Sequence, residues 1–345
     1  MTRRFTSLIL LFFLARAAFP QGDGAVEHMR FFTSREHELS EKYMDYISQV
    51  THGNRARKME KRRQEVIGQI RQSLNEANRL CPYNGDASLR EAYKKYWDIL
   101  LKVFNEDYHK IVDMEAIAEQ SYDQMEAYML AQEKAGEVLS DAQDEIEPVF
   151  NAFAAKNNIR LVEAGETKLD KQLRQAAAVN TYYHRLYLIF FKTYKQEAYV
   201  MDALSRKDLN GLEQNRHTLL KFADEGLAKL DTVKAFKGDG SLATTCRKVL
   251  EFQKVEAEKQ LTTISDFLLK NDEFEKMKKT FDAKPAGRRT QADIDAYNKA
   301  IGEFNTAMQS SNKLLTAMNT SREKVLQNWD ATTKRFLELH VPKAR

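Results

Sequence analysis

The sequence contains few residues that interrupt regular structure. Five prolines and 13 glycines occur among 345 residues, too few for the many tight turns that an all-β protein of this size requires. Hydrophobic residues make up 43% of the chain and charged residues 30%, a composition typical of soluble helical proteins and not of disordered chains. The composition therefore predicts an all-α fold.

Cysteine is also scarce, because the chain has only Cys81 and Cys246. One disulfide between them would join the two halves of the chain, and two buried free thiols are the alternative. The count alone does not distinguish these states, since it says nothing about the distance between the side chains.

Long hydrophobic runs are missing, and no segment approaches the roughly 20 apolar residues that span a bilayer. Residues 1–21 instead place Arg3 and Arg4 before an apolar run over 8–14 and the small-residue pattern Ala-Arg-Ala at 15–17. This is the organisation of a secretory signal peptide. We expect this segment to be removed, the remaining chain to have no transmembrane span, and the protein to be exported to the periplasm or the cell surface.

The charge of the remaining chain is nearly balanced. Without residues 1–21 it carries 51 basic and 50 acidic residues, so its overall charge does not favour a nucleic-acid partner. Six basic residues gather at positions 55–63, opposed only by Glu60. They would suit an acidic partner or a phosphate-bearing glycolipid, but we interpret them as a solvated helix face.

A short segment occurs twice, 153 residues apart. Residues 83–89 read YNGDASL and residues 236–242 read FKGDGSL, and apolar positions match at the same offset on either side. This self-similarity predicts an internal repeat. The shared turn residues are Gly85, Asp86, Ser88, Gly238, Asp239 and Ser241.

Both copies of this turn have a conformational explanation. Gly85 and Gly238 can adopt the left-handed conformation that ends a helix. Ser88 and Ser241 can accept hydrogen bonds from the first free amides of the next helix, and Ser88 forms a capping box with Glu91. A phosphate cradle is the functional alternative, but one or two glycines before a helix are a weak signal, so we interpret the segment as a helix-turn-helix connection.

Apolar residues recur at helical spacing through the first half of the chain. We predict helices over residues 31–51, 59–81, 89–114 and 119–155, the last interrupted around Gly136 and kinked at Pro148.

In the second half, Thr167 and Asp170 open a helix, and a basic loop over residues 276–289 precedes the last one. That last helix carries a heptad pattern over residues 294–339 and would be roughly 70 Å long. The full pattern predicts two tandem, related antiparallel four-helix bundles with long coiled-coil-like helices, over residues 22–165 and 166–345.

Motifs for catalysis and metal binding are missing. The chain has no His-Glu-x-x-His, Cys-x-x-Cys, calcium-loop, Gly-x-Ser-x-Gly or P-loop pattern. Glu106 and His109 have the Glu-x-x-His spacing of di-iron bundles, but the positions 153 residues later are Lys259 and Thr262, so the second half of such a site is missing. We therefore predict no catalytic residue, metal or cofactor. The scattered histidines are His28, His37, His52, His109, His184, His217 and His340.

Two features of the long helices leave alternatives open. A tyrosine-rich face could line a groove for a sugar or peptide, although aromatic residues at helical spacing more often form core; its members are Tyr182, Tyr183, Tyr187 and Tyr194. Glu197 and Arg322 interrupt apolar seams. One hypothesis is that they form internal polar contacts, with each other or with a neighbour such as Asn180, because unpaired burial of either charge is costly. The other is that local helix rotation brings both side chains to water.

The chain resembles a family of uncharacterised, all-helical bacterial proteins that are secreted or displayed at the cell surface. The resemblance lies in the exported start, the two helical units and helix ends such as the segment FAAKNNI at 153–159. Lipid-anchored members of that family carry a modified cysteine that this chain lacks near its N-terminus. The family has no known function, so the resemblance implies no role for any residue.

These observations favour an exported helical protein that binds or scaffolds another envelope protein or a surface component. The alternative is a carrier that holds a small apolar or sugar ligand in a groove between the bundles. A hydrolase with a site assembled from distant residues is a third hypothesis.

Overall fold

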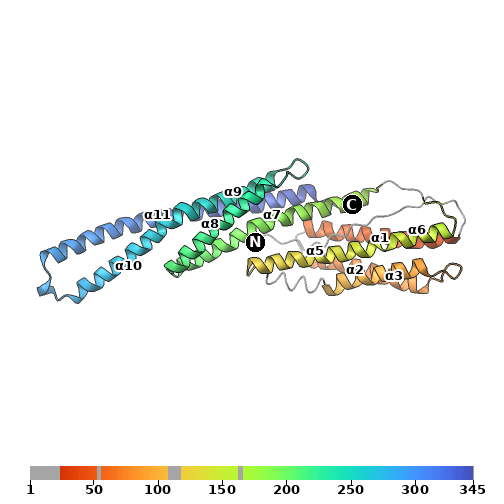
Figure 1. The fold of residues 1–345 in the computed structure, drawn as a ribbon, viewed down its shortest axis with the longest axis horizontal. Coiled ribbons are helices and arrows are strands. Elements are labelled where there is room, and N and C mark those ends of the chain that lie inside the picture. The colour runs from red at the N-terminus through yellow and green to blue at the C-terminus, as the bar shows by residue number, and fades with distance from the viewer. Residues whose placement is uncertain (1–23, 53–55, 108–117, 162–165, 345) are drawn as a thin grey trace. The chain divides into compact units, whose positions relative to one another are not determined.

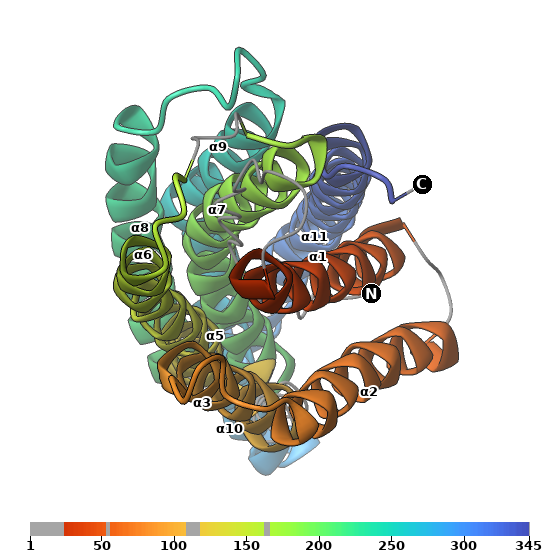
Figure 2. The ribbon, with the colours of Figure 1, turned by 90° about the vertical axis from the view of Figure 1, so that its right-hand side faces the viewer.

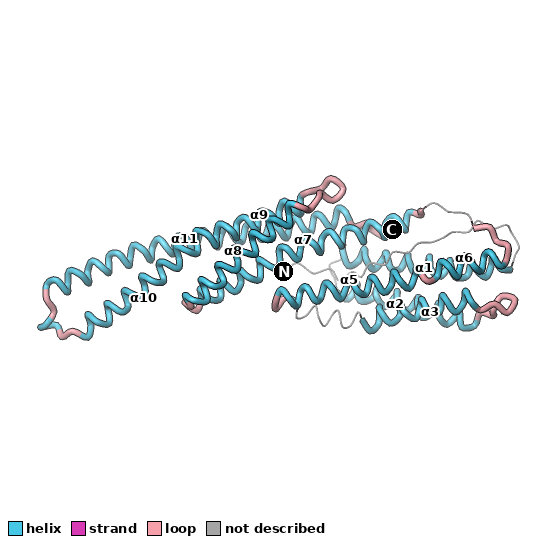
Figure 3. Tube along the Cα trace, in the orientation of Figure 1, coloured by secondary structure: helices cyan, strands magenta, loops and turns pink. Residues whose placement is uncertain are grey.

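The computed structural model describes residues 24–52, 56–107, 118–161 and 166–344. Across these ranges every regular element is a helix and there is no strand (Figure 3). The predicted all-α fold is therefore confirmed. The predicted signal peptide lies outside the described residues.

Contacts divide the chain into two compact units. Unit 1 contains the described residues up to His184 together with residues 335–344, and unit 2 contains residues 185–334. This differs from the expected division at residues 165 and 166, because the boundaries fall inside two long helices. No proline or glycine marks these boundaries in the sequence, so helical periodicity continues through them.

In the described residues of unit 1, three helices and a π-helical turn come first, followed by a second pair of helices. Figure 1 labels these helices. The elements of unit 1 are α1 (Gly24–His52), α2 (Ala56–Arg79), α3 (Ser88–Lys102), η1 (Val103–Asp107), α5 (Tyr122–Asp144), α6 (Ile146–Lys156) and the start of α7 (Lys168–Ser205). Helices α2 and α3 lie side by side and are joined by the turn that contains Gly85 (Figure 2).

Unit 2 repeats the first part of this order. The rest of α7 is followed by α8 (Leu209–Asp231), α9 (Ser241–Val255), the π-helical turn η2 (Glu256–Gln260), α10 (Leu261–Ala283), the short 3₁₀ turn η3 (Ala286–Arg288) and α11 (Gln291–His340). Helix α9 and the turn η2 begin and end 153 residues after α3 and η1, the same offset as the two copies of the turn sequence.

Two predicted helix boundaries are wrong. Helix α5 runs through Gly136 without interruption, and the break comes instead at Glu145, so that Pro148 lies in the first turn of α6, where proline is tolerated. The expected basic loop over residues 276–289 is largely helical, because α10 extends to Ala283.

The two helix-turn-helix connections share one conformation. Gly85 and Gly238 have φ angles of +79° and +88°, in the left-handed region that favours glycine. The predicted serine caps are wrong, because Asp86 Oδ1 accepts the Ser88 amide at 2.9 Å and Asp239 Oδ1 accepts the Ser241 amide at 2.8 Å.

The reciprocal bonds of a capping box are absent at the start of α3 and present at the start of α7. Glu91 bonds Arg90 and Lys94 and does not complete the predicted capping box with Ser88. At the start of α7 the reciprocal bonds do form, with Thr167 N on Asp170 Oδ2 at 2.8 Å and Asp170 N on Thr167 Oγ1 at 3.1 Å.

Candidate binding surface

Each π-helical turn accepts a hydrogen bond from a buried arginine of a neighbouring helix, Arg63 of α2 for η1 and Arg216 of α8 for η2. Arg63 Nη1 donates to the carbonyl of Phe104 at 2.8 Å, and Arg216 Nη1 donates to the carbonyl of Ala257 at 3.0 Å. A π turn shifts the helical hydrogen-bond ladder by one residue, and a buried carbonyl left without a partner is costly. The two guanidinium groups therefore stabilise the same local irregularity in each unit.

The charges of these arginines are balanced in the same way in both units. Glu60 Oε1 lies 2.7 Å from Arg63 Nη2, and Glu213 Oε2 lies 2.7 Å from Arg216 Nη2. Glu213 also accepts the Ser265 hydroxyl at 2.5 Å. Because these bonds join neighbouring elements of the same unit, we assign the two arginines a structural role.

Unit 2 contains a buried ionic cluster of Glu197, Gln253, Glu256 and Arg322. Arg322 Nε donates to Glu197 Oε1 at 2.5 Å, and Arg322 Nη2 donates to Glu256 Oε1. Gln253 Nε2 donates to Glu197 Oε2 at 2.8 Å. The hypothesis that Glu197 and Arg322 pair is therefore confirmed, and the alternative that both reach water is wrong, because the Glu197 side chain is 4% exposed and that of Arg322 16%.

The cluster has two carboxyl groups for one guanidinium. Burial and the neighbouring Glu197 raise the pKa of Glu256 far above its usual range. Glu256 therefore keeps its proton at neutral pH and adds no negative charge to the cluster. The cluster joins α7, α9, η2 and α11 within unit 2.

Unit 1 has a related buried carboxyl group. Glu36 is 4% exposed and accepts the Tyr93 hydroxyl at 3.3 Å. Burial raises the pKa of Glu36 to about 8, so this side chain is also mostly protonated at neutral pH.

The candidate ligand residues from the sequence do not come together as a site. Cys81 is exposed, Cys246 is buried, and both are free thiols, so the disulfide left open by the sequence is not formed. The Cys246 thiol faces the Leu186 carbonyl at 3.8 Å. Glu106 lies in η1 and His109 is outside the described residues. Among the residues that the structure describes, no group of three His, Cys, Asp or Glu side chains could hold a metal ion.

The tyrosine-rich face of α7 packs against other aromatic rings. Tyr183 and Tyr187 are 5% and 8% exposed. Tyr187 stacks on Phe191, and Tyr194 stacks on Phe190 at 5.5 Å. Only Tyr194, 40% exposed, offers much surface, so the face is mainly core.

A groove of about 460 Å³ lies in unit 1 between the middle of α1 and the start of α7. His37, Glu41 and Asp45 line one side, Lys168 and Gln172 the other. Its volume suits a small ligand, and its lining is mostly polar.

A further candidate surface is the helical hairpin at the far end of unit 2, which we call the arm and define as residues 266–310. It consists of most of α10, the connection through η3 and the first part of α11. Figure 1 shows these two helix segments running together with no other described helix beside them. No residue from 266 to 310 is buried, although aromatic side chains lie along both helices of the arm.

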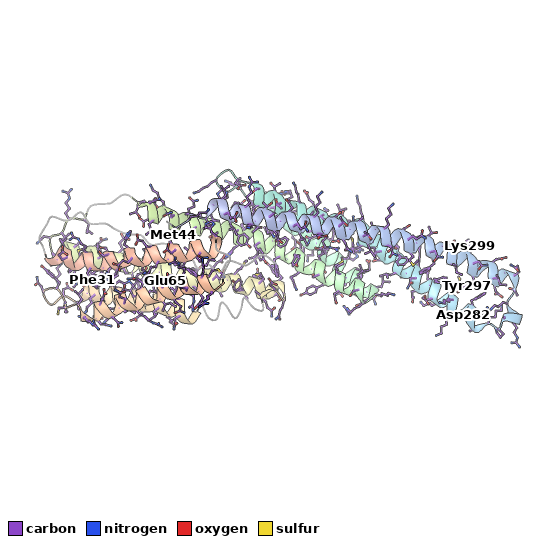
Figure 4. The ribbon with its side chains drawn as sticks, turned by 180° about the vertical axis from the view of Figure 1, so that it is seen from behind. Phe31, Met44, Glu65, Asp282, Tyr297 and Lys299 are labelled. Carbon is purple, nitrogen blue, oxygen red and sulfur yellow. The ribbon has the colours of Figure 1, made fainter. Side chains whose placement is uncertain are left out.

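These aromatic rings form a ladder between the two helices of the arm. Phe281 stacks on Tyr297 with ring centroids 4.1 Å apart, and Phe274 stacks on Phe304 at 4.5 Å. Phe267 continues the ladder to Phe304 at 6.0 Å. Figure 4 shows Tyr297 on the side of α11 that faces α10. The ladder holds the arm together but remains half-exposed.

A groove of about 950 Å³ runs along one side of the arm. Phe274 and Phe304 lie in it together with Met277, which is 44% exposed. Sequence reasoning recognised the heptad of α11 but missed its partner in α10. The signal was present, because Phe267, Phe274 and Phe281 recur at seven-residue spacing.

Within the described ranges, no helix is both long enough and apolar enough to cross a membrane. The chain matches no known family model, no curated protein and no solved structure.

Proposed function

We propose that this protein is an exported helical scaffold that binds another component of the cell envelope or surface, and that the arm is its binding surface. The observation that supports this is the aromatic ladder of the arm, left half-exposed on a two-helix hairpin without one buried residue over 266–310. Apolar side chains that line an open groove, such as Met277 and Phe274, are typical of interaction sites. The proposal assigns no catalytic step, metal or cofactor to the chain.

Export to the periplasm or the cell surface rests on the sequence pattern of residues 1–21. Binding at an envelope surface requires no net charge, which fits the nearly equal numbers of basic and acidic residues that remain after residue 21.

We also propose that the two units arose by internal duplication of a helical bundle. The turn at Gly85 and Gly238, the π turns and the arginine bonds to Phe104 and Ala257 all recur 153 residues apart. The units would then be two related bundles in tandem, with the arm as an elaboration of the second.

Site-specific photo-crosslinking in the producing cells tests the binding function. A photoreactive amino acid replaces Met277 in the arm, and the matched control replaces Leu130, an apolar side chain of α5 that is 57% exposed. We expect a discrete crosslinked product from position 277 and none from position 130. Equal or absent crosslinking at the two positions would reject the arm as the binding surface.

The groove at the start of α7 supports a second candidate, a carrier of a small ligand. Its location within unit 1 differs from the groove between bundles that the tyrosines suggested. A ligand held there would raise the melting temperature, and the rise should disappear when Lys168→Glu reverses the charge of one wall. A ligand screen without any stabilisation would reject the carrier.

A further inference from the structure

The helices of the arm are an incomplete bundle. Two antiparallel helices bury one seam between them, whereas a four-helix bundle encloses its apolar side chains on all sides. In the arm, Phe274, Phe304 and Met277 remain accessible in the open groove. Two further helices packed along this groove would complete the bundle.

The groove has the surface that a helix pair needs for close approach. Ala300, Gly302 and Ala307 line its α11 side, and such small side chains let another helix pack near the backbone. Lys270 and Glu273 stand on the α10 side, with Lys299 and Glu303 on α11. The groove thus has equal numbers of positive and negative side chains, a pattern that does not select a strongly charged partner.

The arm is nevertheless polarised along its length. Its tip, residues 276–295, carries six basic and three acidic side chains, a net charge of +3. Its base, residues 266–275 and 296–310, carries two basic and five acidic side chains, a net charge of −3. An antiparallel neighbour with the same charge distribution would place each basic tip on an acidic base. The molecule with that distribution is a second copy of this chain.

We propose that two copies of this protein associate through their arms, with the tip of one arm on the base of its partner, to form an antiparallel four-helix bundle. This inference rests on the proposed function of the arm as a binding surface. A two-fold axis makes such an interface self-complementary, because each contact between tip and base occurs twice. Part of the attraction is electrostatic between exposed groups, so the association weakens as salt rises.

Charge reversal at the two ends of the arm tests the arrangement. One variant carries Lys278→Glu and Lys279→Glu at the tip, and the other carries Glu273→Lys and Glu275→Lys at the base. All four side chains are exposed. The control, Lys221→Glu with Lys229→Glu on α8, makes the same charge change as the tip variant outside the arm. Sedimentation equilibrium of the full chain measures association, and circular dichroism verifies that each variant folds.

We expect the wild type and the α8 control to dimerise, and each arm variant alone to associate at least tenfold more weakly. In the tip variant both ends of the arm are acidic, and in the base variant both are basic. An equimolar mixture should therefore form heterodimers that are tighter than either variant's own dimer and weaker than the wild type, because one contact between tip and base keeps its full charge difference and the other keeps only part of it. Weakening of each variant on its own distinguishes tip-on-base from tip-on-tip contact, because in a tip-on-tip dimer the same substitutions would relieve repulsion between like-charged ends.

A wild type that stays monomeric at all concentrations tested would overturn the inference, as would a dimer that neither arm variant weakens or a mixture that associates no more tightly than either variant alone. These outcomes leave the proposed function separately testable. If photo-crosslinking at Met277 yields a different protein while the purified chain is monomeric, the binding function stands and self-association is rejected.

Discussion

Removal of Arg322 should selectively destabilise unit 2. The variant Arg322→Met keeps much of the apolar length of the side chain and deletes its charge. It leaves Glu197, which is 3% exposed, as a buried carboxylate without its cation. Loss of one partner from a buried ion pair costs about 3–5 kcal/mol. We expect about 3 kcal/mol, the lower end, because Arg322 is 16% exposed and the Gln253 amide still donates to Glu197.

The two tryptophans allow this loss to be assigned to one unit. Trp97 lies in unit 1 and Trp329 in unit 2, where it stacks on Phe190 at 4.4 Å. Fluorotryptophan labelling gives one fluorine NMR signal for each, so urea unfolding of the two units can be followed in the same sample. A loss of 3 kcal/mol in a unit of this size lowers its melting temperature by about 6–12 °C.

A double-mutant cycle completes the test. Glu197→Gln and Arg322→Met should show a coupling energy of about 1–3 kcal/mol, because the residues share a hydrogen bond. The control Lys324→Met removes an exposed charge from the same helix and should stay within about 0.5 kcal/mol of the wild type. Two results would show that the cluster does not stabilise unit 2. One is an Arg322→Met variant whose Trp329 unfolding transition shifts no more than that of the Lys324→Met control, and the other is a coupling energy near zero.

Three further predictions concern single positions, each measured with the tryptophan signal of the unit involved. Burial raises the pKa of Glu36 in the folded protein to about 8, so its contribution to stability is present below the ordinary carboxyl pKa and is lost as the pH rises towards 8. Relative to the wild type, Glu36→Gln should therefore gain on the order of 3 kcal/mol of stability between pH 4 and pH 7. A stability difference between the two proteins that does not change with pH would contradict the assigned shift. Arg63→Met and Arg216→Met each leave a buried carbonyl unpaired and should cost about 2–3 kcal/mol of stability in their own units. The control Arg57→Met, on the exposed surface of α2, should be nearly neutral. Similar losses from all three variants would contradict the role of Arg63 and Arg216 in stabilising the π turns. Gly85→Ala and Gly238→Ala should each cost about 1–2 kcal/mol of stability because φ is positive at both positions. Gly136→Ala has open space around the added methyl group and should gain about 0.5–1 kcal/mol of stability. A loss of stability in Gly136→Ala would contradict the open surroundings of that position.

Helix periodicity was sufficient to predict most of the secondary structure, since long apolar seams dominate the sequence. It also identified Glu197 and Arg322, because each interrupts such a seam. It did not identify Glu256, the third charged member of the cluster. Glu256 begins a π turn, and the extra residue of a π turn changes which side chains face inward. A constant helical period therefore no longer predicts the inward-facing positions there.

The arm could not be predicted from sequence for a different reason. Its α11 segment has the heptad pattern of a core helix, and the pattern itself is correct, because Tyr297 and Phe304 do pack against α10. What periodicity cannot reveal is how many other helices cover the seam. That number depends on tertiary packing, and here the absence of buried residues over 266–310 is what distinguishes an open hairpin from a core helix.

The comparison of the two units gives the strongest reason to place function in the arm. Up to the π turns they share a turn conformation and a buried arginine at matching positions. Beyond them they differ, because α5 and α6 bury side chains such as Leu139 and Phe153, at 0% and 1% exposure, whereas residues 266–310 bury none. Unit 1 thus demonstrates that helices following this template can enclose their apolar faces. The half-buried aromatic ladder of the arm is therefore the feature of unit 2 that unit 1 does not share among its described residues, and it is the reason for proposing the arm as the binding surface.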